Sequence, residues 1–241
     1  MRRFLIDPVP PGQLTIDLGK EECHHIQRVL RLKQGDTIEL FDGQGMVHQA
    51  TITALTKRVT VTIQSSRQIV PPRPRLHLHL GLLKGKKMEL LVQKATELGV
   101  HALHPFTSDF TEARPPREQK KERWQKISLE ACKQCGRNWP LAMAETSPLE
   151  KQLDNLPAGA TSLLFWEDEK KTGPGDIMLP PGLPELHLFI GPEGGFSAAE
   201  VSRCQEKMSA VSLGPLTLRA ETAVITALSL ALFLSGRMDH Q

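Results

Sequence analysis

Apolar and polar residues alternate through much of the first seventy residues. The runs 36–43, 47–55 and 58–63 each alternate apolar or β-branched side chains with polar ones, and the first run ends in an Asp-Gly turn signal. Before these runs, residues 21–32 repeat apolar positions at helical spacing. Short strands at close spacing with one helix predict a small β-barrel.

A proline-rich segment follows this β-rich part. Pro71, Pro72 and Pro74 fall within four residues, and proline fits neither a helix interior nor a central strand. We therefore predict a first domain at 1–70, a linker at 71–75 and a second domain at 76–241.

Beyond residue 75 the pattern changes to apolar strands that alternate with helical segments. Strands are predicted at 76–83, 100–106, 161–166 and 185–190, and helices at 86–99, 115–136, 197–207 and 220–235. This alternation is typical of an α/β protein with a largely parallel sheet, whose binding site lies at the carboxyl ends of the strands.

The composition is that of an ordinary globular protein. The chain has 241 residues, of which 39% are hydrophobic and 24% charged, enough to bury a core in one or two domains. Four cysteines are too few for a disulfide scaffold, and the first residues do not resemble a signal peptide. The longest apolar stretch, 223–234, is too short to span a bilayer. We expect a cytosolic protein with reduced thiols and no membrane partner.

Charge is distributed unevenly along the chain. Residues 1–137 contain 23 Lys and Arg against 14 Asp and Glu, a net +9, whereas residues 138–241 contain 7 against 13, a net −6. This uneven charge favours an anionic partner that docks on residues 1–137. The alternative is chance clustering of solvated charged side chains. The stretch 114–137 has eight Lys and Arg, three Glu and Trp124, which is typical of RNA binding and also of a solvated basic helix face.

Two glycine-containing loops carry the strongest candidate chemistry. The first, 190–196, has three glycines within five residues and precedes a Ser-x-x-Glu capping box at 197–200. It matches neither a Rossmann fingerprint nor a P-loop, so it is either a ligand loop or a structural turn. The second, 213–222, places Arg219 and Glu221 before an apolar helix. There they either pair or touch a ligand, or form an ordinary helix start with a surface partner.

Cysteine and histidine spacing predicts no metal site. Cys132 and Cys135 form a C-x-x-C pair late in a predicted helix, without a second pair for zinc. His24 and His25 have no cysteine or histidine partner at metal spacing. We interpret the two cysteines as packing residues and expect no metal cofactor.

Together the motifs resemble those of the SPOUT-class 16S rRNA (uracil-N3)-methyltransferase family. The resemblance rests on Phe-Ile-Gly-Pro-Glu-Gly-Gly-Phe-Ser at 189–197 and Leu-Gly-Pro-Leu-Thr-Leu-Arg-Ala-Glu-Thr-Ala at 213–223. Further matching segments are 1–4, 24–31, 84–99 and 123–137. In one departure, Phe110 stands where the family commonly has an arginine, so no role of that arginine is carried over.

The resemblance implies an α/β fold in which a SPOUT trefoil-knot methyltransferase domain follows a small PUA-like β-barrel domain that binds RNA. It also implies S-adenosylmethionine as the methyl donor, ribosomal RNA or the small ribosomal subunit as the partner, and a homodimer. Strand periodicity alone would predict no knot, because true knots are very rare.

The resemblance also implies the residues of the site. Arg219 and Glu221 are the catalytic candidates. The cofactor-binding candidates come from three loops: Phe165, Trp166, Glu167, Ile190, Gly191, Pro192, Glu193, Gly194, Gly195, Leu213, Gly214, Leu216, Leu218 and Thr222. The RNA-binding candidates are basic side chains: Arg2, Arg3, His25, Arg28, Arg31, Lys84, Lys87, Lys94, Arg123 and Arg137.

The implied reaction transfers a methyl group to N3 of one uridine in 16S ribosomal RNA. Because the uridine N3–H is largely protonated at neutral pH, we expect Arg219 to hydrogen-bond a uracil carbonyl and stabilise the anionic ring. Glu221 is a weak base for so poor an acid, which favours a role in orienting Arg219. The alternatives are methylation of another RNA or base position, a non-catalytic RNA-binding protein, and a nucleotide-dependent α/β enzyme.

Overall fold

The computed structural model describes residues 2–238; Met1, which belongs to the amino-terminal motif, and residues 239–241 lie outside this range. The chain forms two compact units. The first unit comprises Met1–Pro71 with Leu129–Pro140, and the second comprises Pro72–Ser128 with Leu141–Gln241. The long helix α3, Glu118–Cys135, contributes residues to both units.

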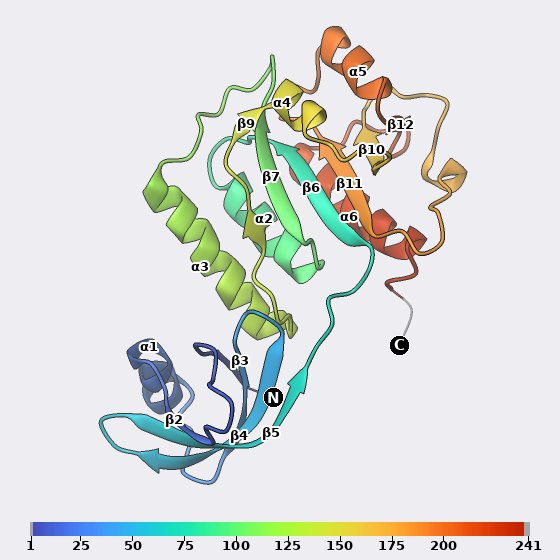
Figure 1. Ribbon diagram of the computed structural model, residues 1–241. Helices are drawn as coiled ribbons and strands as arrows, with labels where there is room; N and C mark the ends of the chain where they lie inside the picture. The colour runs from blue at the N-terminus through green and yellow to red at the C-terminus, as the bar shows by residue number, and fades with distance from the viewer. Residues whose placement is uncertain (1, 239–241) are drawn as a thin grey trace. The chain divides into compact units, whose positions relative to one another are not determined.

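The first unit is built on a five-stranded mixed sheet (Figure 1). β1 and β3 pair in parallel, and the other neighbouring strands pair antiparallel. The strand order is β1 (Arg3–Leu5), β3 (Thr37–Phe41), β4 (Met46–Leu55), β5 (Val59–Gln68) and β2 (Thr15–Asp17). The predicted helix at 21–32 is α1 (Lys20–His24), which continues as a π-helix over His25–Val29. The alternating apolar side chains of the strands, together with Ile26, form the core of this unit.

Arg3, one of the RNA-binding candidates, has its side chain enclosed within the first unit. Its guanidinium donates hydrogen bonds to the backbone oxygens of Cys132 and Arg137, both at 3.0 Å, and its Nε pairs with Glu39 at 2.6 Å. It also donates to the side chain of Asn138. With its side chain only 7% exposed, Arg3 fixes the segment that follows α3 rather than facing solvent.

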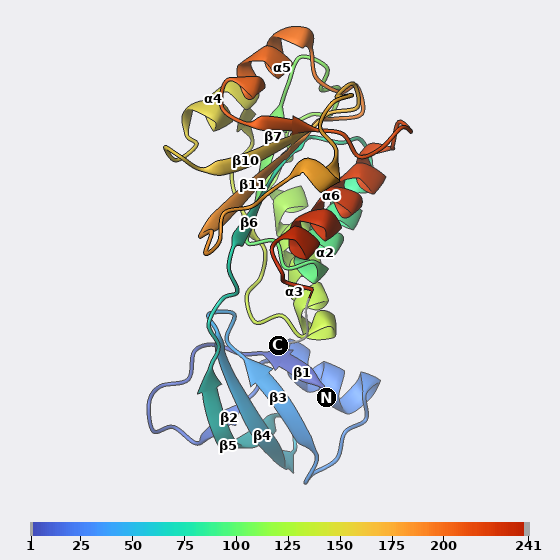
Figure 2. The same cartoon turned by 90° about the vertical axis from the view of Figure 1, so that its right-hand side faces the viewer.

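The second unit is a parallel sheet between two layers of helices (Figure 2). Its main path runs β12 (Ser209–Val211), β10 (Thr161–Phe165), β11 (Glu185–Ile190), β6 (Arg75–Gly81), β7 (Ala102–Thr107) and β8 (Ala142–Met143), and β9 (Ser147–Pro148) also pairs with β7. All of these strand pairs are parallel. The remaining elements are α2 (Lys87–Glu97), α4 (Leu149–Asp154), α5 (Ala198–Gln205), α6 (Ala220–Leu234) and a 3-10 turn at Pro174–Asp176.

The strand alternation sends side chains to both helical layers. Leu76, Leu78 and Leu80 of β6 join the core formed with α2 and α6. On the opposite face, Phe106 and Phe189 pack with residues of α4 and α5. Because both faces are covered, the central strands β6, β7, β10 and β11 are mostly buried, as is usual in a parallel sheet.

Histidines occupy part of the face that carries α4. His77 and His79 of β6 lie beside His104 of β7 and His187 of β11, with ring centroids 4.5–5.3 Å apart. Burial, reinforced by the neighbouring imidazoles, lowers the pKa of His77 and of His187 to about 4 and that of His79 to about 2. These side chains are therefore neutral at physiological pH.

Within residues 2–238, no helix is both long and apolar enough to cross a membrane.

Candidate active site

The glycine loop that follows β11 folds tightly. Gly195 has φ +72°, and a Cβ built there would lie 2.5 Å from Oε1 of Glu167. A Cβ on Gly191 would lie 3.0 Å from the ring of Phe196. Ser197 then caps α5, because its side chain accepts a hydrogen bond from the Glu200 backbone while Glu200 accepts one from the Ser197 backbone. The glycines therefore allow the loop to approach the loop after β10 closely.

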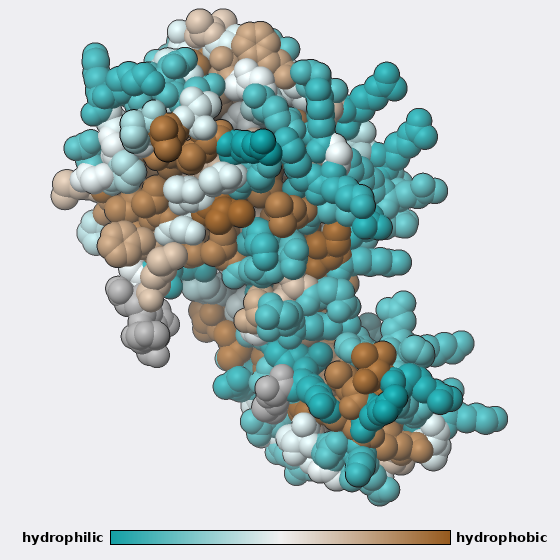
Figure 3. Space-filling view, turned by 180° about the vertical axis from the view of Figure 1, so that it is seen from behind, coloured by the Kyte–Doolittle hydropathy of each residue, from teal (hydrophilic) through white to brown (hydrophobic). Residues whose placement is uncertain are grey.

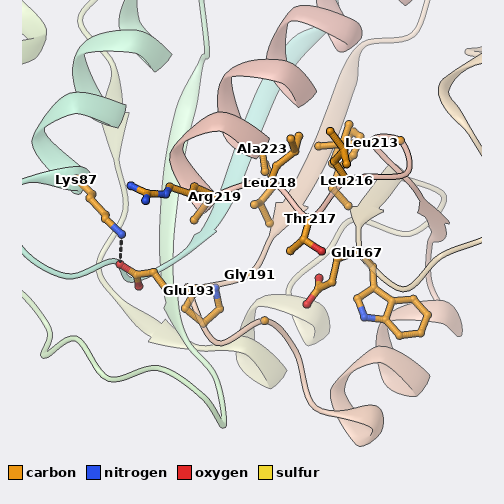
Figure 4. A pocket seen from close by; sticks show the side chains of 17 residues that line it. Lys87, Glu167, Gly191, Glu193, Leu213, Leu216, Thr217, Leu218, Arg219 and Ala223 are labelled. Atoms are coloured by element: carbon orange, nitrogen blue, oxygen red, sulfur yellow. Dashed lines mark hydrogen bonds and ion pairs between the residues drawn. The ribbon is translucent and has the colours of Figure 1, made fainter.

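A cavity of about 360 Å³ lies at the carboxyl ends of β10 and β11 (Figure 4). Three loops and the first turn of α6 line it, and its wall is apolar in one part and polar in another. The lining residues are Lys87, Phe165, Trp166, Glu167, Ile190, Gly191, Pro192, Glu193, Gly195, Leu213, Gly214, Leu216, Thr217, Leu218, Arg219, Ala220 and Ala223. The position is the one expected for a ligand site in a parallel α/β sheet.

Charged side chains gather at one side of this cavity. Lys87 Nζ lies 3.0 Å from Glu193 Oε1 and 3.7 Å from Glu221 Oε2. The backbone N–H of Lys84 also donates to Glu193 Oε1, at 3.1 Å. The hydrogen bond to Glu193 raises the pKa of Lys87. Desolvation acts to raise the pKa of Glu193, but the bonds from Lys87 and from backbone N–H groups outweigh it and the pKa is lowered.

Arg219 and Glu221 do not form the pair that we expected from the sequence. Within the described part of the chain, no ion pair or hydrogen bond joins them, and the nearest cation to Glu221 is Lys87. The reason is geometric: Arg219 is the N-cap of α6, so its side chain leaves before the first helical turn that carries Glu221. Figure 4 shows Arg219 directed along the cavity wall towards Lys87.

The structure brings most of the predicted cofactor-binding residues into one cavity. The candidates that do not line it are Gly194 and Thr222. A Cβ on Gly194 would lie 2.8 Å from Cβ of Phe110, so the residue that replaces the family's arginine packs against the glycine loop. Thr217, Ala220 and Ala223 line the cavity although we did not single them out; the first lies between two candidates of the same motif.

The predicted RNA-binding cations have different environments. Arg2, Arg28 and Arg31 are exposed in the first unit, and Arg2 Nη1 approaches the backbone oxygen of Leu30 at 3.5 Å. His25 is half-buried, with its ring edge-on to Phe4, and Arg137 is also half-buried.

In the second unit, each candidate cation has a carboxylate partner. Lys94 pairs with Glu97 at 2.8 Å and Arg123 pairs with Glu89 at 2.9 Å. Lys84 pairs with Glu112, and Lys87 lies at the cavity. The most exposed of the candidate arginines without such a carboxylate partner are therefore those of the first unit.

Comparisons with known proteins match both units. An RNA methyltransferase domain model matches residues 71–232, and an RNA methyltransferase PUA domain model matches residues 18–64. The ribosomal RNA small subunit methyltransferase E of Bacillus subtilis is 32% identical, over 89% of this chain and 88% of its own. That of Synechocystis is also 32% identical, over 94% of this chain and 76% of its own.

Solved structures show the same similarity over the whole chain. The crystal structure of a ribosomal RNA small subunit methyltransferase E from Neisseria gonorrhoeae, bound to S-adenosylmethionine, superimposes with a TM-score of 0.87. It is 31% identical and the match covers 97% of this chain and 98% of the other. The fold is accordingly that of a SPOUT methyltransferase domain preceded by a PUA-like domain. The chain belongs to the RNA methyltransferase family that contains the ribosomal RNA small subunit methyltransferase E proteins.

Proposed function

We propose that the protein is an S-adenosylmethionine-dependent methyltransferase that modifies N3 of a uridine in the RNA of the small ribosomal subunit. The observation that carries the proposal is the cavity built from the Gly191–Gly195 loop, the Leu213–Leu218 loop and the start of α6. These loops contain the two motifs at 189–197 and 213–223 on which the family resemblance rests, and two similar proteins, from Neisseria gonorrhoeae and Legionella pneumophila, hold S-adenosylmethionine in their solved structures.

The cavity fits this cofactor in size and in chemistry. Its volume of about 360 Å³ is within the usual range for small-molecule sites, about 300–1,000 Å³. Apolar walls formed by Ile190, Leu213 and Leu218 suit a flat adenine ring, and the polar side with Lys87 suits a charged amino-acid part. Because Gly195 has no Cβ, the glycine loop can lie close to Glu167 at the edge of the cavity. We propose contacts from the lining residues and assign supporting roles to Gly194 in the glycine loop and to Thr222 in the first turn of α6.

Bound S-adenosylmethionine would supply a methyl group on a positively charged sulfur, an electrophile that needs no further activation. The protein must then orient the uracil and lower the cost of removing the N3 proton. Arg219 is exposed at the cavity, and no described carboxylate forms an ion pair with it, so we propose that its guanidinium donates to a uracil carbonyl oxygen as negative charge develops on the ring. Glu221 instead holds Lys87 together with Glu193.

The uridine must be unpaired or flipped out when it reacts, because N3 lies on the Watson–Crick edge. The exposed arginines 2, 28 and 31 of the first unit provide phosphate contacts for docking the RNA. We accordingly propose that residues 1–70 form the RNA-docking domain and that 76–241 form the methyltransferase domain.

The finer features that the family resemblance implies belong to the same proposal: a trefoil knot in the second unit, a homodimer and action in the cytoplasm. The dimer is supported by apolar surface on the helical side of the second unit, seen in Figure 3. On the helices of this unit, Phe233 of α6 is 67% exposed and Leu90 of α2 is 39% exposed. Sedimentation equilibrium of the purified protein tests the dimer directly.

Mass mapping of the modified RNA tests the function. Unmodified small-subunit RNA, either free or assembled with its proteins, is incubated with the protein and S-adenosylmethionine and then digested for mass spectrometry. We expect one added methyl group on one uridine, at N3. Methylation of another base atom or another RNA would contradict the substrate assignment, and calorimetry that detects no S-adenosylmethionine binding would indicate a non-catalytic RNA-binding protein.

A further inference from the structure

A histidine cluster lies away from the proposed methyl-transfer cavity. Five of the chain's nine histidines belong to it: His77 and His79 on β6, His101 and His104 at β7, and His187 on β11. His187 is the direct cross-strand neighbour of His77, and Glu185 lies two residues earlier on the same face. These positions fall near the amino-terminal ends of β6 and β11, whereas the cavity lies at their carboxyl ends.

Hydrogen bonds determine which ring nitrogen of His187 carries its proton. Gln152 Nε2 donates to the backbone oxygen of Pro105 at 2.9 Å, so Gln152 Oε1 faces His79 and accepts a hydrogen bond from its Nδ1–H at 2.6 Å. Neutral His79 then offers only a lone pair at Nε2, which accepts from Nδ1–H of His187 at 3.0 Å. His187 Nε2 is consequently left with an unprotonated lone pair.

The lone pair on His187 Nε2 faces no hydrogen-bond donor among the described atoms. Among the described atoms, His187 Nε2 and His77 Nε2 are buried and form no hydrogen bond. Instead, both face Oε2 of Glu185, His77 Nε2 at 3.8 Å and His187 Nε2 at 3.9 Å. His77 reaches the same tautomer when its Nδ1–H donates to His104 Nε2, at 3.1 Å. Two lone pairs that converge on a carboxylate repel one another unless a cation lies between them.

We propose that His77, His187 and Glu185 bind a divalent transition-metal ion of the Zn²⁺ class. One ligand atom from each lies within 4.8 Å of the others, compared with about 3.4 Å between ligands that sit about 2.0–2.1 Å from a tetrahedral ion. Glu185 Oε2 already lies 3.8 and 3.9 Å from the two Nε2 atoms, and its side chain, 35% exposed, can adjust further. The larger closure is therefore between the two imidazole rings. Two imidazoles and a carboxylate suit Zn²⁺ rather than Ca²⁺ or Mg²⁺, and solvent completes the coordination.

The surrounding bonds have the form of a metal site's outer shell. Metal-binding histidines generally donate their second ring N–H to an acceptor, and here His187 donates to His79, which is held in turn by Gln152. Arg75 Nη1 lies 3.9 Å from the other oxygen of Glu185. The ion would join β6 to β11 at their amino-terminal ends. Spacing along the chain does not reveal this site, because His77 and His187 are more than a hundred residues apart.

The test uses untagged full-length protein treated with a chelator and then titrated with Zn²⁺ by calorimetry. We expect one equivalent to bind per chain, and Glu185→Gln and His77→Gln to weaken binding at least ~tenfold, as the loss of a ligand should. His24→Gln removes an exposed histidine of the first unit and should leave the affinity unchanged. Zn²⁺ should raise the melting temperature of the wild type and of His24→Gln more than that of either ligand variant.

Two further measurements distinguish loss of a metal ligand from loss of the fold. Circular dichroism and melting of the metal-free variants show whether they fold, and X-ray absorption of the wild-type zinc complex reports its ligands even if a variant does not fold. A shell with two imidazoles and oxygen donors is expected. Sulfur in the shell would place the ion at a cysteine instead and overturn the proposal. An absence of stoichiometric binding, or equal affinity in folded wild type, Glu185→Gln and His77→Gln, would overturn it as well.

Discussion

Arg219 begins α6 as its N-cap, yet its side chain does not cap the helix. An arginine has no acceptor for the free N–H groups of a first turn, so this position is a poor choice for helix stability alone. The residue instead lines the cavity and is exposed there. Its location is more consistent with a contact to a ligand than with a structural role.

Replacing Arg219 by alanine should lower kcat about 10²-fold, the usual cost of losing one donor to a developing anion. Binding of S-adenosylmethionine should change much less, because the apolar walls remain. Arg219→Lys keeps the charge but not the planar fork, and should recover only part of the rate. The matched control is Arg203→Ala on α5, which removes an exposed cation paired with Glu150. Wild-type kcat for Arg219→Ala at saturating RNA would exclude the assigned role.

Gly195 should be sensitive to the smallest possible substitution. Gly195→Ala brings a Cβ to 2.5 Å from Glu167 Oε1 and also strains a backbone at φ +72°. Gly159 has a similar φ of +74° but open space around it, so Gly159→Ala introduces the strain without the clash. The backbone strain should cost each variant about 1–2 kcal/mol of stability, and the clash should add to the loss in Gly195→Ala. Calorimetry should find weaker S-adenosylmethionine binding for Gly195→Ala alone, by about tenfold, or about 1.4 kcal/mol. Equal affinities in the two variants would contradict the close approach of the loops.

Helix α5 depends on its capping box. Ser197→Ala removes the acceptor for the Glu200 N–H and the hydrogen bond from Ser197 Oγ to Asp109 at 2.6 Å. Urea denaturation should show a loss of about 1 kcal/mol in unfolding free energy. Ser202→Ala is the control on the same helix, because the Ser202 hydroxyl donates back to the Ala198 carbonyl at 3.0 Å and alanine favours a helix interior. A loss of the same size in both variants would mean that the cap contributes nothing specific.

The longer helices and strands were predictable, because a hydrophobic pattern repeats over several helical turns or over several strand residues. α2 ends before Gly99 at φ +70°, as expected of a helix stop, and β6, β10 and β11 lie where apolar runs indicated. The two-residue strands β8 and β9 were missed, because two residues show no alternation. The helical run at 21–32 gave no sign that its second half is a π-helix.

The site was predictable through its motifs but not through its ion pairs. The two glycine loops meet as their positions after successive strands suggested. The partner of Glu221, in contrast, is Lys87, more than a hundred residues away and considered only as an RNA contact. The acceptors of Arg3 on Cys132 and Arg137 were unpredictable for the same reason, because they are distant in sequence. Long-range polar contacts leave no periodic signal.

The structure shows which of the many cations in residues 1–137 are paired with carboxylates and which are exposed. The net +9 of residues 1–137 includes many cations that pair with carboxylates, such as Lys94 with Glu97. Arg28 and Arg31 of the first unit are exposed and lie close together in sequence after α1. They are therefore the best available pair for phosphate contacts within that unit.

RNA affinity should fall steeply with salt, and these two arginines should account for part of the slope. Each phosphate contact contributes about 0.7–0.9 to the slope of log K against log salt, so Arg28→Gln with Arg31→Gln should reduce it by about 1.5. The control pair is Lys57→Gln with Arg58→Gln, which removes the same charge at another exposed position of the first unit. Fluorescence anisotropy across a salt series measures both. A net-charge effect alone would change the two slopes equally, whereas docking through residues 28 and 31 predicts a change in the first variant only. Equal slopes in both variants would therefore remove these arginines from the RNA-binding surface.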